Sequence, residues 1–212
     1  MLVATAPIAA HAVPTGLAPG SGYRIAFVTT ASSAQSSDIT TYNAFAASLA
    51  ALSPLTVSAH AWSVIASTPT VNAISNIACA GCANLPIYDT QNHLIAANTA
   101  ALFSGTLQYA IKATQFGATL VNAAIWTGTD SDGTGLAGQQ LGNASQLALL
   151  GLSDQTSSTY LRYVQGVYTG ATFGLYALSD EVFVAGVPEP ASLAVLGGGL
   201  ALAMMRRRRS RA

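Results

Sequence analysis

Charged residues are scarce in this chain. Asp, Glu, Lys and Arg make up only 8% of its 212 residues, whereas an average soluble domain has about 25%. This scarcity excludes a charge-rich disordered chain, a coiled coil and the composition of an ordinary cytosolic enzyme. The length suits one domain, or one domain with tails.

Basic residues are nearly missing from the body of the chain. Five of the eight basic residues lie at the end, at positions 206–209 and 211. Between residues 13 and 187, three basic residues (Arg24, Lys112 and Arg162) stand against seven acidic ones, so the net charge there is 3 − 7 = −4. Such a body cannot neutralise a run of phosphates, and no nucleic-acid partner is expected. Its polarity comes from hydroxyls and amides, which is common in exported envelope proteins.

The N-terminus lacks the positive charges that usually open a signal peptide. Residues 1–12 are nevertheless apolar and end in Ala10-His11-Ala12, a pattern that suits signal peptidase. We predict a signal-peptide remnant over 1–12, followed by a linker over 13–22. An ordinary apolar N-terminus is the alternative.

The C-terminus has three parts in a fixed order. Val187, Pro188, Glu189 and Pro190 precede an apolar run from Ala191 to Met205, and an arginine cluster follows at Arg206, Arg207, Arg208 and Arg209. The run has 15 residues, which is short for a membrane helix of about 20. Arginine stems can snorkel and relieve this mismatch, and the arginines would stay cytoplasmic. A buried core helix with a basic tail fits badly, because nothing polar interrupts one face.

These three parts, over about residues 187–211, resemble the PEP-CTERM sorting signal of exported bacterial proteins. The resemblance implies recognition by exosortase, a membrane transpeptidase, with processing near Pro188-Glu189-Pro190. It also implies a precursor anchored in the inner membrane through the C-terminal helix, delivery to the cell surface or extracellular matrix, and a link to exopolysaccharide. The segment 187–212 is therefore expected to be an address.

The body reads as strands, loops and few helices. Apolar residues recur at helical spacing at Ile39, Tyr42, Phe45, Ala46 and Leu49, with Ser37 or Asp38 as the N-cap. Short helical segments are expected within 68–77 and 98–104, and strands at 23–30, 61–66, 85–95 as a hairpin, 123–126, 174–179 and 181–184. The first and last strands have similar character, so the ends are expected to meet in one sheet. The fold class is α+β.

Four segments of the body, in order, resemble endostatin domains: 62–67, the hairpin 85–95, Ala101-Leu-Phe-Ser-Gly105 and 125–133. The resemblance implies a C-type-lectin-like fold over residues 23–186, with a twisted antiparallel sheet and two or three short helices. The disulfides, heparin-binding arginines and zinc histidines of that family have no counterpart here. Only the fold is carried over, because fold does not imply function.

Two motifs could hold a metal. Asp130 and Asp132 are spaced so that both carboxylates can face one calcium ion, although turn chemistry explains the same pattern. Cys79 and Cys82 form a Cys-x-x-Cys pair that we expect to be a local disulfide. A zinc site completed by His60 and His93, or a redox motif, is the alternative. No other cofactor is indicated.

No catalytic residues are predicted. Asp89 and His93 could form an acid–base pair, but a hairpin histidine is more often a turn residue. Trp62 and Trp126 could stack on sugars, but both lie in apolar strands, which favours the core. With no catalytic cluster found, the two resemblances imply a non-enzymatic, surface- or matrix-targeted protein that binds or associates with exopolysaccharide. An envelope hydrolase and a purely structural matrix protein remain as alternatives.

Overall fold

A computed structural model describes residues 14, 16–30, 36–56, 59, 61–167 and 172–185. The strands are β1 (Gly22–Val28), β2 (Trp62–Val64), β3 (Ile87–Asp89), β4 (Leu94–Ala96), β5 (Ala124–Trp126), β6 (Leu147–Leu152), β7 (Val164–Val167), β8 (Gly174–Ser179) and β9 (Val182–Phe183). The helices are α1 (Ile39–Ala50), α2 (Ala73–Asn76) and α3 (Thr99–Leu102), with 3₁₀ turns η1 (Cys82–Asn84) and η2 (Ser158–Tyr160). This confirms the predicted mixture of a mostly β structure with few helices.

The strands form one sheet in the order β4-β3-β1-β8-β5-β6-β7, with β2 also paired to β8 and β9 to β1. The first strand, β1, pairs antiparallel with β8 and β9, so the prediction that the chain ends meet in one sheet is confirmed. The expectation of an antiparallel sheet is wrong for two pairs, because β1–β3 and β5–β8 are parallel. Parallel neighbours need a long crossover, and the segments between these strands supply one.

The two central strands are buried on both faces. In β1, Ile25 and Phe27 belong to one core, whereas Ala26 and Val28 belong to the other. Strand β8 divides its side chains in the same alternating way. Strands buried on both faces have nearly continuous apolar sequences, which explains the apolar runs at both ends of the body.

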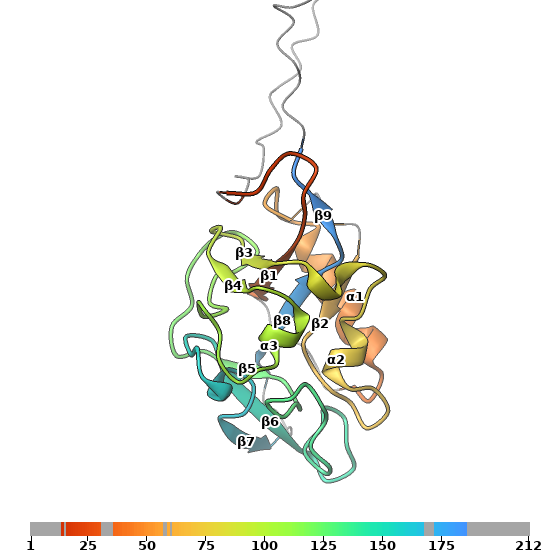
Figure 1. Cartoon of the computed structure of the whole chain (residues 1–212). Helices are drawn as coiled ribbons and strands as arrows, with labels where there is room; N and C mark the ends of the chain where they lie inside the picture. The colour runs from red at the N-terminus through yellow and green to blue at the C-terminus, as the bar shows by residue number, and fades with distance from the viewer. Residues whose placement is uncertain are drawn as a thin grey trace, which may run out of the picture.

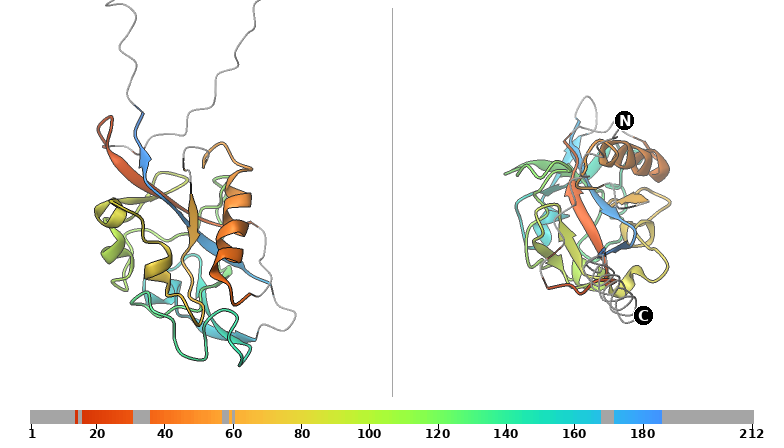
Figure 2. Two further views of the ribbon diagram at one scale, coloured as in Figure 1. Left: turned by 90° about the vertical axis from the view of Figure 1, so that its right-hand side faces the viewer. Right: turned by 90° about the horizontal axis from the view of Figure 1, so that it is seen from above.

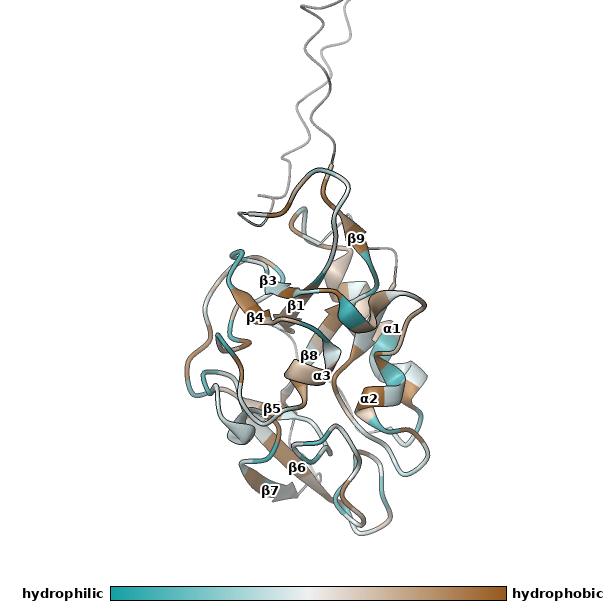
Figure 3. Cartoon of the chain, in the orientation of Figure 1, coloured by the Kyte–Doolittle hydropathy of each residue, from teal (hydrophilic) through white to brown (hydrophobic). Residues whose placement is uncertain are grey.

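Helix α1 stands along one side of the sheet (Figure 2). Its N-cap is Asp38, whose carboxylate accepts the Thr40 N–H at 2.9 Å. Its buried residues recur at helical spacing and pack in the first core beside β2. The short helices α2 and α3 contribute to the second core. Strands β4 and β6 are brown along much of their length in Figure 3, as expected of strands that supply core residues.

The sheet runs from β9 at one end of the molecule to β6 and β7 at the other (Figure 1). At the β9 end, the Gly20 N–H donates to the Val184 carbonyl at 2.9 Å, so the two described ends of the chain lie side by side. The predicted signal remnant (1–12) and sorting segment (187–212) lie outside the described residues. Among the described helices, none is long and apolar enough to cross a membrane.

Candidate functional site

Asp130 and Arg162 form an ion pair at the surface. The Arg162 Nη1 lies 2.8 Å from Oδ2 of Asp130 and 3.1 Å from Oδ1. The Ser131 N–H also donates to Oδ1, at 2.7 Å. Burial raises the pKa of Asp130, but the Ser131 N–H and the Arg162 guanidinium outweigh it and hold that pKa below its ordinary value. The carboxylate is therefore ionised and fixed in place.

The second predicted calcium ligand, Asp132, is hydrogen-bonded to a residue two positions further along the chain. Oδ1 of Asp132 accepts the N–H of Thr134 at 2.9 Å and its hydroxyl at 2.6 Å, which closes an Asx turn. The part of the chain that the structure describes contains no group of three His, Cys, Asp or Glu side chains that could hold a metal ion. A calcium ion at Asp130 would also compete with Arg162. The calcium site therefore stays a prediction.

The surface around this ion pair is open and polar. The Arg162 side chain is 52% exposed, and Tyr163, which follows it directly, is 57% exposed. Hydroxyls of Ser131 and Thr134 and the two carboxylates add donors and acceptors. We call these six residues the Asp130–Arg162 surface: Asp130, Ser131, Asp132, Thr134, Arg162 and Tyr163. It offers a carboxylate and a guanidinium to a ligand rich in hydroxyls, and Tyr163 adds an exposed aromatic ring next to Arg162 in the sequence.

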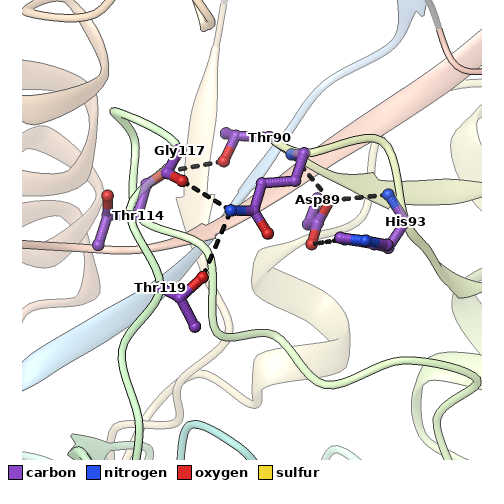
Figure 4. A network of polar contacts seen from close by, with 7 residues as sticks. Asp89, Thr90, His93, Thr114, Gly117 and Thr119 are labelled. Atoms are coloured by element: carbon purple, nitrogen blue, oxygen red, sulfur yellow. Dashed lines mark hydrogen bonds and ion pairs between the residues drawn. The ribbon is translucent and has the colours of Figure 1, made fainter.

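Asp89 and His93 meet at the β3–β4 hairpin (Figure 4). The Asp89 carboxylate is fully buried, and its Oδ2 lies 2.9 Å from His93 Nδ1. Its Oδ1 accepts the N–H groups of Gln91 and His93, both at 2.8 Å. The His93 ring stacks on Tyr109, with centroids 4.0 Å apart. The carboxylate thus closes the turn and fixes the imidazole at the same time.

Such a fixed imidazole has the geometry of a general base. The hydroxyls near it in Figure 4 have other partners, however: Thr90 Oγ1 donates to the Thr114 carbonyl at 2.7 Å, and Thr119 Oγ1 accepts from the Gln91 amide at 3.3 Å. Among the described residues, no hydroxyl or thiol is hydrogen-bonded to the His93 ring. The contacts seen here are those of a hairpin clamp.

Cys79 and Cys82 are joined by a disulfide between α2 and η1, with their Cα atoms 5.3 Å apart. Of the two histidines considered as zinc partners, His93 lies on the hairpin and bonds Asp89, and His60 lies outside the described residues. A pocket of about 360 Å³ opens beside the disulfide. Arg24 and Cys82 are its buried lining residues, whereas Ala83 is exposed at its rim.

Arg24 is the functional candidate that sequence reasoning missed. It lies in β1 and is only 1% exposed. Its Nε donates to the Ser179 carbonyl and its Nη2 to the Ile77 carbonyl, both at 2.7 Å. Burial lowers its pKa to about 10, although the charge of Asp180 acts in the opposite direction. The sequence gives no signal for this, because a lone arginine at the start of a strand is typical of a surface position.

The tryptophans are core residues, as predicted. Trp62 packs edge-on against Phe27 with ring centroids 4.9 Å apart, and Trp126 packs against Phe173 at the same distance. Their rings are therefore not platforms for a sugar.

No model of a known protein family matches the chain, and no curated protein matches it.

Proposed function

We propose that this chain is an exported, non-enzymatic protein whose folded part binds exopolysaccharide at the cell surface or in the extracellular matrix. The Asp130–Arg162 surface is the proposed contact. The observation that carries the proposal is the fixed, exposed Asp130–Arg162 pair, which is followed directly in the sequence by the exposed Tyr163. A polysaccharide presents hydroxyls to the charged pair and a largely apolar ring face to the tyrosine.

The order of segments supports a C-type-lectin-like, endostatin-like fold as part of the proposal. A hairpin over 87–96 leads into α3, and the strand Ala124–Trp126 leads into the polar loop that carries Asp130. Long irregular stretches, such as residues 127–146, connect the later strands. The two parallel strand pairs depart from the expected antiparallel sheet.

The delivery route is proposed from the C-terminal sequence. Residues 187–190, the apolar run 191–205 and the arginines after it support recognition by an exosortase-type transpeptidase. The precursor would be held in the inner membrane and then sorted to the surface or matrix. The disulfide is consistent with folding outside the reducing cytosol.

A second candidate, an envelope hydrolase, is favoured by one observation. The buried Asp89 carboxylate orients the His93 imidazole, as a carboxylate orients the histidine of a hydrolase active site. This function would require a nucleophile or an activated water at His93 once substrate is bound. It is separated from polysaccharide binding by the His93→Ala variant described in the Discussion.

The proposal is tested by binding the full-length chain to immobilised exopolysaccharide of its host, first with calcium and then with EDTA. We expect saturable binding that survives EDTA, because Arg162 rather than a cation balances Asp130. Saturable binding that is lost in EDTA would support the proposed binding function and also the predicted calcium site at Asp130 and Asp132. Self-association without saturable binding would overturn the proposal in favour of a structural matrix protein.

A further inference from the structure

The end of the molecule at β9 carries exposed apolar side chains from several segments. Phe183, in β9 itself, is 62% exposed. Helix α1 ends towards the same end of the molecule (Figure 2), and Leu52, two residues beyond the helix, is 65% exposed. The segment that follows α1 reaches the start of β9, because the Ala61 carbonyl accepts the Asp180 N–H at 3.0 Å. Two large apolar side chains from distant parts of the sequence are therefore exposed at one end.

A third apolar side chain belongs to a loop that packs on the turn after α1. A Cβ atom at Gly117 would lie 3.2 Å from Cδ1 of Leu55, so the loop and the turn lie side by side. Phe116, which precedes Gly117 directly, is 51% exposed. We call Leu52, Phe116 and Phe183 the β9-end surface. Single exposed apolar residues are normal on a protein, whereas their gathering at one end is typical of a contact with a protein or a membrane.

The chain leaves the fold at this same end, shortly before its apolar C-terminal run. Ala185 is the last described residue after β9, and the apolar run begins at Ala191. Six residue steps span at most about 22 Å, whereas a domain the size of residues 14–185 is roughly 40 Å across. If the run lies in a bilayer, the opposite end of the domain, with β6 and β7, cannot reach that bilayer. The β9 end is then the end that faces the membrane.

We propose that the β9-end surface rests on the lipid bilayer while the precursor is anchored, with Phe183 and Leu52 at the level of the headgroups. This orientation rests on the proposed function, because it requires residues 191–205 to lie in the membrane. Exposed Phe and Leu side chains gain free energy by leaving water for the interface. The contact is apolar, since Glu181 directly precedes β9 and anionic headgroups would repel it. The Asp130–Arg162 surface then points away from the membrane, towards the matrix.

The test is the fluorescence of tryptophan probes in the full-length chain reconstituted into phosphatidylcholine vesicles. Phe183→Trp places a probe on the β9-end surface, and Tyr163→Trp, at an exposed aromatic residue of the opposite end, is the matched control. The wild-type protein gives the background, because Trp62 and Trp126 are buried in all three proteins. Lipids brominated near the top of their acyl chains quench only a ring that touches them. We expect them to quench Phe183→Trp and to leave Tyr163→Trp unquenched beyond the wild-type background.

Flotation of the same vesicles in a density gradient separates the two ways in which the proposal can fail. Protein that floats with the vesicles but shows no quenching of Phe183→Trp, or equal quenching of Phe183→Trp and Tyr163→Trp, would overturn the orientation and leave the anchored precursor standing. Protein that does not float would overturn both the orientation and the membrane-held precursor of the proposed function. Exopolysaccharide binding is measured without vesicles and is decided by neither result.

Discussion

His93 is held by Asp89 four residues earlier, through a 2.9 Å contact between Nδ1 and Oδ2. The acid is fully buried, whereas the imidazole is 40% exposed. Together with the stacked Tyr109 ring, this contact fixes the hairpin that leads into α3. The pair is thus a structural clamp whose outer ring edge faces away from the acid.

Replacing His93 by Ala is expected to weaken the fold without affecting polysaccharide binding. The buried Asp89 carboxylate loses one donor and keeps two backbone N–H groups, which corresponds to a loss of about 1–2 kcal/mol in the free energy of unfolding. Urea denaturation measures the loss, with the exposed Gln108→Ala as a control. Removal of a hydrolytic activity by His93→Ala would instead support the hydrolase.

Reduction of the disulfide is expected to lower the free energy of unfolding by a modest, measurable amount. Closing a loop as short as Cys79–Cys82 changes the entropy of the unfolded chain by an amount worth about 2 kcal/mol. The urea midpoint of the wild-type protein should fall when a reductant is added, and that of Cys79→Ala/Cys82→Ala should not change. A shift of equal size in the double variant would show that the reductant acts elsewhere.

The Asp130–Arg162 ion pair is expected to make the free energy of unfolding depend on pH in the acid range. The pKa of Asp130 is lowered in the folded protein, so its contribution is fully present above its ordinary value of 3.8 and is lost as pH falls through the lower folded value. Urea midpoints measured from about pH 6 down to about pH 2 follow this loss. Arg162→Gln should reduce the acid-dependent part. An identical profile in both proteins would mean that the pair does not stabilise the fold.

Strand β6 packs tightly against the backbone of residues 160 and 161. A Cβ atom at Gly151 would overlap the Tyr160 carbonyl, a backbone group that cannot rotate away. Gly151→Ala is therefore expected to lower the free energy of unfolding by about 2 kcal/mol or more. At Gly166 the same atom meets side chains and no backbone: the flexible end of Leu150 closely, and the Trp126 ring at an ordinary contact distance. Gly166→Ala should therefore cost less. Equal costs in urea denaturation would refute this packing.

Much of the fold could be predicted from local patterns. Helix α1, its Asp38 cap, the β3–β4 hairpin and the central strands all follow from spacing, turn residues and apolar runs. Strands β6 and β7 were missed. The sequence from Leu147 to Leu152 is apolar without alternation, so no strand period marks it, and its role depends on its partner β5. The parallel pairings likewise depend on distant segments.

The candidate sites were only partly predictable. Asp130 could be singled out, but its partner Arg162 lies 32 residues away and nothing in either segment signals the pair. Arg24 could be counted as a charge, yet its burial depends on carbonyls from α2 and β8 that only the fold brings near. Long-range partners of single polar residues leave no local pattern in one sequence.

The most direct test of the central claim compares two exposed aromatic residues at opposite ends of the molecule. Tyr163 directly precedes β7 in the Asp130–Arg162 surface, and Phe183 lies in β9 at the other end (Figure 1). Binding of the full-length Tyr163→Ala and Phe183→Ala variants to host exopolysaccharide is measured beside the wild-type protein. We expect Tyr163→Ala to lose about tenfold in affinity and Phe183→Ala to match the wild type. Equal affinities in all three proteins would contradict polysaccharide binding at this surface.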